Sequence, residues 1–133
     1  MTADPDVGAA ILRAEPQLFV TDLMVSLAFF ESLGFSIAFT WGEPPSYGHV
    51  VRGGAHINLR EVEGPVHAPG FAERERDPLG AILVVAHADT LFREFEGLGV
   101  PFHQRLRDEP WGARTFIVRD PDGNLLLFAG PAA

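Results

Sequence analysis

The chain has 133 residues, of which 18 are acidic and 10 are basic, giving a formal net charge of −8, and it contains no cysteine and no lysine. This length predicts one domain, and the missing residue types exclude disulfides, iron–sulfur ligation, thiol catalysis and Schiff-base chemistry. A negative surface repels phosphate backbones, so we expect no nucleic-acid partner. No apolar run is long enough to span a membrane, and the acidic first eight residues lack the basic segment of a signal peptide. We therefore expect a cytoplasmic protein that begins with a loose tail and makes no membrane contact.

The first half of the chain predicts a strand, a helix and three more strands. Residues 15–20 alternate as a strand does, Thr21 or Asp22 can cap the helix that follows, and Gly34 can end it. The apolar stripe expected on this helix is Leu23, Leu27, Phe30 and Leu33. The three later strands are expected over 35–41, 47–52 and 55–61.

The second half repeats this order after a shift of 65 residues, with five identities between 20–34 and 85–99. The repeat predicts a helix that ends at Leu98 and strands over 80–86, 100–107, 113–119 and 124–129. The segment 63–78, rich in proline and glycine, is expected to link a module over about 12–62 to a module over about 79–130. We therefore expect an α+β fold of two tandem βαβββ modules, each with a mixed sheet and a helix on its outer face.

The hairpin turns predict which side chains share a face of each sheet, since residues of one parity point the same way. With Gly53-Gly54 as a two-residue turn, one face of the first hairpin carries Tyr47, His49, Val51, His56, Asn58 and Arg60. The same reasoning places Phe35, Ile37, Phe39 and Trp41 together on one face. With a four-residue turn at Asp120–Gly123, Arg114 and Phe116 share a face with Leu127.

Two segments carry a resemblance to a known family, PQLFVTDLMVSLAFFESLGF at Pro16–Phe35 and WGARTFIVRDPDGNLLLF at Trp111–Phe128. They resemble the vicinal oxygen chelate superfamily, which includes glyoxalase I, extradiol dioxygenases and bleomycin resistance proteins. The resemblance covers nearly the whole chain from Glu15 and implies two βαβββ modules that form a cupped sheet. In pattern the chain is most similar to the bleomycin resistance proteins, which are small, acidic and catalytically inert and bind a cationic glycopeptide between two subunits.

The resemblance also implies four metal-ligand positions, on the first and fourth strands of each module, which are Glu15, Asn58, Gly80 and Leu127. Gly80 has no side chain and Leu127 cannot coordinate, so we expect neither a metal nor another cofactor at these positions, and we do not predict catalysis. His49 and His56 lie on adjacent strands near Glu15. They leave two interpretations open, a hydrogen-bonded pair of cleft histidines or an atypical metal site.

Aromatic side chains at Phe39 and Trp111 are the ligand platforms that the resemblance implies, although Phe39 and Phe102 also fit an ordinary core. The candidate ligand-binding residues are Phe39, Trp41, His49, His56, Asn58, Arg60, Phe102, Trp111, Arg114 and Phe116. Two of these residues, Arg60 and Arg114, are expected in the same cleft, and a pair of guanidinium groups suits an anionic ligand. The acidic residues near the aromatic positions would instead attract a cation.

These features predict a metal-independent small-molecule binding protein that sequesters an aromatic or cationic compound, such as an antibiotic, in a cleft of a homodimer. Exposed strand edges favour the dimer. Pro16 marks either a strand exchanged between partners or an ordinary strand edge. One alternative is a metal-dependent lyase or dioxygenase of the same superfamily, with Glu15, His49 and His56 on an atypical metal. The other is a structural or regulatory module whose cleft is filled by side chains.

Overall fold

The computed structural model describes residues 8–132, so all of the predicted tail except Gly8 lies outside the described residues. The first module consists of β1 (Gln17–Val20), α1 (Leu23–Ser32), β2 (Ser36–Trp41), β3 (Tyr47–Arg52) and β4 (Ala55–Glu61). A connection with the short helix α2 (Phe71–Arg74) leads to the second module. That module consists of β5 (Leu79–Val84), α3 (Ala88–Gly97), β6 (Phe102–Asp108), β7 (Ala113–Arg119) and β8 (Leu125–Pro131).

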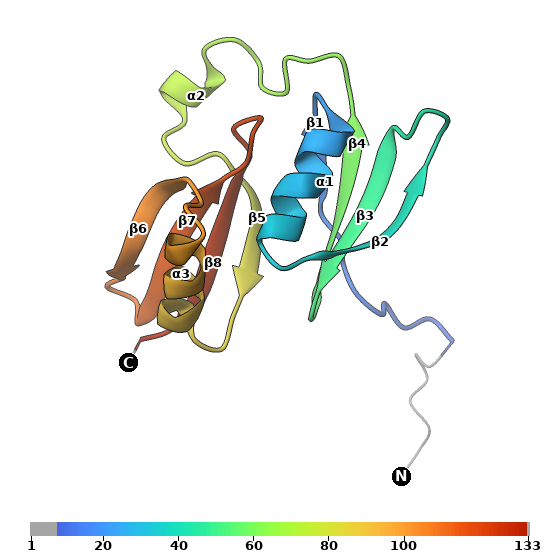
Figure 1. Ribbon diagram of the computed structural model, residues 1–133. Coiled ribbons are helices and arrows are strands. Elements are labelled where there is room, and N and C mark those ends of the chain that lie inside the picture. Colours follow the sequence, from blue (N-terminus) through green and yellow to red (C-terminus); the bar gives the residue numbers. More distant parts are fainter. Residues whose placement is uncertain (1–7, 133) are drawn as a thin grey trace.

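Each module folds into one four-stranded mixed sheet, in the order β1-β4-β3-β2 for the first and β5-β8-β7-β6 for the second. The first strand of each module runs parallel to its last, and the other neighbours are antiparallel. Figure 1 shows the two sheets side by side, with β6 and β2 at opposite ends of the molecule. The predicted α+β fold of two tandem βαβββ modules is confirmed.

Helix α1 begins and ends where its sequence predicts. Asp22 is the N-cap, and its carboxylate accepts a hydrogen bond from the backbone N–H of Val25 at 3.2 Å. Gly34 follows the helix with a φ of 84°, and the equivalent Gly99 after α3 has a φ of 73°. The predicted apolar stripe of α1 is buried, as are the three first-hairpin side chains beneath it, Val50, Ile57 and Leu59.

The register of the first hairpin is confirmed, but the regular alternation predicted for β2 is not. His49 pairs with Asn58, and Arg52 pairs with Ala55 across the turn. In β2 the pairing shifts between Ile37 and Phe39, which is a β-bulge. The bulge reverses the alternation, so Phe35 is buried in the core whereas Phe39 is 52% exposed on the other side of the sheet. The prediction that these two rings share a face is wrong.

The second hairpin is one residue out of the predicted register. Arg119 pairs with Leu125, and Phe116 pairs with Phe128, so the loop has five residues, 120–124. Asn124 belongs to this loop because its backbone N–H and its amide both donate to the Asp120 carboxylate, at 2.7 and 2.9 Å. Burial raises the pKa of Asp120, against the opposing effect of these hydrogen bonds.

Three predicted cleft residues lie on the helix side of the second sheet, and the one-residue difference accounts for two of them, Arg114 and Phe116. Phe116 is fully buried and contacts the rings of Phe92 and Phe102, so Phe102 also packs in the core. Arg114 bonds Asp108 and lies 3.9 Å from Asp89 of α3. The cleft placement predicted for Phe102, Arg114 and Phe116 is therefore wrong.

The modules are joined by one apolar core and by polar contacts at its edges. Buried side chains of both modules, from α1 to α3, form a continuous cluster. The Arg52 guanidinium donates to the backbone oxygen of Leu33 and to both carboxylate oxygens of Glu94 on α3. At the other edge, the Thr21 hydroxyl donates to Asp122 at 2.6 Å. These contacts fix the two sheets relative to each other.

Candidate ligand-binding site

The first sheet has one face covered by α1 and one face that points away from it, which we call the open face. Strand pairing brings together on it the predicted site residues of the first module, namely Phe39, Trp41, His49, His56, Asn58 and Arg60. Tyr47 lies among them, opposite both Trp41 and Arg60. Six of the ten predicted residues therefore share one surface.

Aromatic rings form a layer on the open face. The ring of Phe39 lies parallel to that of His49, with 5.3 Å between centroids and 4° between planes, and it also stacks on Tyr47. His49 is 5% exposed, whereas Trp41 is 72% exposed. An aromatic ring that packs on a buried ring through one face and is open to solvent on the other suits planar or cationic ligands.

A chain of polar contacts runs beside this layer. The Asn58 amide donates to Glu15 at 3.0 Å, while its oxygen lies 2.6 Å from Nδ1 of His49. The other nitrogen of His49, Nε2, lies 3.0 Å from Nδ1 of His56. The hydrogen bonds from Arg13 and Asn58 lower the pKa of Glu15, so this carboxylate is ionised near neutral pH.

Trp111 lies at the tip of the β6–β7 hairpin, where its side chain is 73% exposed. The backbone N–H of Glu109 donates to Ala113 across this tip, and Gly112 has a φ of 94° that completes the turn. Because β2 and β6 are at opposite ends of the molecule, Trp111 is remote from Trp41 within one chain (Figure 1).

The charges near Trp111 are already paired. Arg114 donates to Asp108, which lowers the pKa of that carboxyl, and Arg107 does the same for Glu109. Thr115 also donates its hydroxyl to Glu109. Asp108 and Glu109 therefore offer less attraction to a cation than their sequence positions suggest, and Arg114 offers less to an anion.

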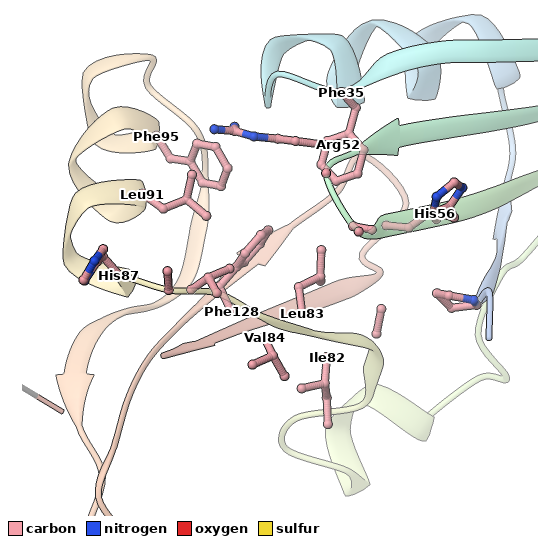
Figure 2. Close-up of a pocket in the computed structure, with 18 of the residues that line it drawn as sticks. Phe35, Arg52, His56, Ile82, Leu83, Val84, His87, Leu91, Phe95 and Phe128 are labelled. Atoms are coloured by element: carbon pink, nitrogen blue, oxygen red, sulfur yellow. The ribbon is translucent and has the colours of Figure 1, made fainter. Parts of the chain in front are cut away.

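A hollow of about 690 Å³ lies between residues of the two modules, beside the free edge of β5. Figure 2 shows Phe35, Arg52 and His56 on its first-module side, and β5 and the start of α3 on its second-module side. Its lining is mostly apolar, and its volume is in the usual range for small-molecule sites. The sequence did not predict it, because it depends on how the modules pack.

The four metal-ligand positions implied by the sequence resemblance do not fit a divalent metal. Glu15 and Asn58 are in contact, but the other two positions belong to the second sheet and bring no donor atom. A Cβ on Gly80 would lie 2.8 Å from the end of the Leu18 side chain, so a larger residue there would require Leu18 to move. Leu127 pairs with the buried Ile117 in apolar surroundings. We derive no chemistry through a metal at this set of positions.

Two groups were not predicted, one on the open face of the first sheet and one on the second sheet. Tyr47 belongs to the aromatic layer, and its parity with His49 was a signal that could have identified it. In the second module, the Gln104 amide donates to the Thr115 hydroxyl on the face away from α3. A five-residue loop after β7 would have placed Thr115 on that face.

The duplicated βαβββ architecture is the one that the resemblance to the vicinal oxygen chelate superfamily implied. The sequence model of the Glyoxalase/Bleomycin resistance protein/Dioxygenase superfamily matches residues 11–128, and the chain belongs to this superfamily. The resemblance read from the sequence is therefore confirmed. No curated protein matches the chain significantly by sequence.

Several solved structures share the fold. TioX from Micromonospora sp. ML1 is 23% identical, with a TM-score of 0.68 over 91% of this chain and 97% of that chain. A bleomycin-binding protein complexed with bleomycin is 22% identical, with a TM-score of 0.71 over 89% and 97%. The bleomycin-binding protein from bleomycin-producing Streptomyces verticillus, complexed with copper(II)-bleomycin, is 25% identical, with a TM-score of 0.70 over 93% and 98%.

Among the described residues of this chain, no helix has the length and apolar character needed to cross a membrane.

Proposed function

We propose that this chain binds a small aromatic or cationic compound, an antibiotic of the bleomycin type being the first candidate, and holds it without chemical change. The observation that carries the proposal is the aromatic layer on the open face, where Phe39 stacks on the buried His49 and Trp41 is exposed beside it. Similarity to two bleomycin-binding proteins supports this ligand class. The misfit of the four family positions supports binding without a metal there.

We further propose that the binding cleft is shared by two copies of the chain. Trp41 and Trp111 are at opposite ends of one chain, so one ligand can contact both only if the second comes from a partner. The free edge of β5 carries Ile82 and Val84, which are 62% and 86% exposed. Apolar side chains on an unpaired strand edge favour association with another copy.

The charge of the chain favours a cationic ligand over an anionic one. The formal net charge is −8, and the pairing of Arg114 with Asp108 removes one of the two arginines that suggested an anion. Arg60 remains on the open face, opposite Tyr47. A ligand with a cationic part and a planar ring fits this combination best.

Tryptophan fluorescence tests both parts of the proposal, because Trp41 and Trp111 are the two tryptophans of the chain. The titration uses bleomycin, metal-free and copper-loaded, with EDTA-treated protein. Trp41→Phe and Trp111→Phe variants each leave a single reporter. We expect saturable quenching in both variants, at about one ligand per chain and at similar concentrations, and EDTA treatment should not alter it.

The outcomes separate the parts of the proposal. Quenching of Trp41 alone would place the ligand on the open face of a single chain and contradict the shared cleft. An absence of quenching at high micromolar bleomycin, in the metal-free and copper-loaded forms alike, would exclude bleomycin as the ligand. The matched control is His103→Ala, on β6 and bonded to Asp77, which should titrate as wild type does.

A metal-dependent lyase or dioxygenase is the second candidate, and one observation favours it. Glu15, His49 and His56 bring donor atoms within 4.8 Å of one another. Enzyme activity requires turnover in addition to binding, so the discriminating result is product formation that stops when EDTA-treated protein is used and returns when metal is added.

A further inference from the structure

We propose that Glu15, His49 and His56 form a site for one divalent transition-metal ion within the first module. The site shares only Glu15 with the four positions implied by the family, and it stands whether or not the chain binds an antibiotic or catalyses a reaction. Its three donors come from the segment before β1, from β3 and from β4, and each lies within 4.8 Å of the other two.

The spacing of the two imidazoles suits a shared ion. Nε2 of His49 and Nδ1 of His56 are 3.0 Å apart. Two nitrogens bound to one zinc ion at its usual bond lengths, with an angle between 90° and tetrahedral, are about 2.9–3.4 Å apart. The hydrogen bond between the rings therefore holds both nitrogens at a distance that a metal ion can bridge.

A relay of hydrogen bonds presents the correct nitrogen of His49. The ionised Glu15 only accepts, so the NH₂ group of Asn58 faces it and the Asn58 oxygen faces His49. Nδ1 of His49 must then carry its proton, which leaves the lone pair of Nε2 directed at His56. Metal-binding histidines usually have such a partner on the second nitrogen. In His56 the proton on Nδ1 moves to its own Nε2 when the ion enters, with no net proton lost.

The donor set selects a class of ion. Two imidazoles and one carboxylate suit zinc, nickel or copper, whereas magnesium and calcium prefer oxygen ligands throughout. His49 is buried and held by the ring of Phe39, so one donor is fixed in place. Glu15 and His56 are partly exposed, which gives the ion a path from solvent and leaves coordination positions for water.

One neighbouring charge opposes the metal. Arg13 donates to the second carboxylate oxygen of Glu15, and its side chain is 54% exposed. An arginine this exposed can swing into solvent, but its positive charge repels a dication. Arg13→Ala should therefore tighten metal binding by about fivefold, the effect of removing one like charge near a surface. A loss of affinity in this variant would contradict the site.

Isothermal titration calorimetry of the EDTA-treated full chain, prepared without a polyhistidine tag, tests the site directly. We expect about one zinc or nickel ion per chain and no heat of binding for magnesium. His56→Ala and Glu15→Gln, chosen because both residues are partly exposed, should each weaken binding at least tenfold. His103→Ala removes a histidine outside the cluster and should bind as wild type does.

The proposal is overturned if the wild-type chain binds no zinc or nickel, or if His56→Ala binds as tightly as wild type. Magnesium binding equal to that of zinc would overturn the assigned class of ion. Circular dichroism of each metal-free variant confirms that it is folded before titration. Because the bleomycin titration uses EDTA-treated protein, its failure and the failure of the metal site are separate results.

Discussion

Phe116 and Phe39 both lie on hairpin strands next to a polar residue, but their environments are opposite. Phe116 is 0% exposed and stacks on Phe128 with 4.9 Å between ring centroids. Phe92 and Phe95 contact it edge to face from α3. Phe39 has one ring face against His49, and half of its side chain is in solvent. At the residue scale, the first ring stabilises the fold and the second remains available to a ligand.

This difference predicts the effects of truncating each ring. Phe116→Ala should lower the free energy of unfolding by about 3–5 kcal/mol, because it removes a buried ring and leaves a cavity. Phe39→Ala should lower the free energy of unfolding by about 1 kcal/mol, the value of an exposed stacked pair, and should also weaken ligand binding. Urea unfolding and the bleomycin titration measure the two effects. If Phe116→Ala has near-native stability but binds bleomycin more weakly, Phe116 lies in the ligand cleft and its assignment to the core is wrong.

At the scale of elements, the turns decided how much could be predicted from the sequence. Gly53-Gly54 allows only a short turn, so the register of β3 and β4, and with it the open face, followed correctly. The sequence DPDGN marks a turn equally well, but whether Asn124 belongs to it depends on hydrogen bonds to Asp120 that no local pattern reveals. The bulge at β2 was not predicted either. It shifts the strand pairing between Ile37 and Phe39, so Phe35 is in the core and Phe39 is not. The predicted fold is correct despite both errors, but the misjudged turn placed Arg114 and Phe116 in the cleft when they lie on the helix side of the sheet.

The contact between the β3–β4 hairpin and α3 predicts a dependence of stability on pH. Hydrogen bonds from Arg52 lower the pKa of Glu94 in the folded chain. The stabilisation is therefore present above the ordinary pKa of a glutamate and is lost as the pH falls through the lower, folded value. Both side chains are partly exposed, so we expect Glu94→Gln to cost only about 0.5–1 kcal/mol at pH 7.

Urea unfolding of Glu94→Gln and wild type between pH 7 and pH 3 measures this contribution. The difference between the two proteins should shrink as the pH falls, because wild-type Glu94 becomes progressively protonated and loses its bond to Arg52. Glu31→Gln makes the same substitution on the exposed side of α1, where the described residues give it no ion pair, and should have little effect at any pH. A difference that grows toward low pH would contradict the assigned sign.

In the molecule as a whole, the two exposed tryptophans lie on different sheets. Trp41 belongs to β2 and Trp111 follows β6, and these two strands are at opposite ends of the molecule (Figure 1). Between them, β5 has a free edge beside the hollow that residues of both modules line. A second copy placed against this edge would cover its apolar side chains and bring its own strands to the open face.

The proposed shared cleft predicts that a charge on the β5 edge both dissociates the dimer and weakens ligand binding. Ile82→Arg places that charge on a side chain that is 62% exposed in the single chain, so the fold of the chain itself should tolerate it. Leu98→Arg is the matched control, since Leu98 is 58% exposed at the end of α3, away from the edge. In sedimentation velocity we expect wild type and Leu98→Arg to be dimers and Ile82→Arg to be mostly monomer. If the cleft belongs to two copies, dissociation and loss of binding must occur together. A wild-type protein that is monomeric, and in which bleomycin still quenches both tryptophans, would therefore show that one chain binds the ligand alone.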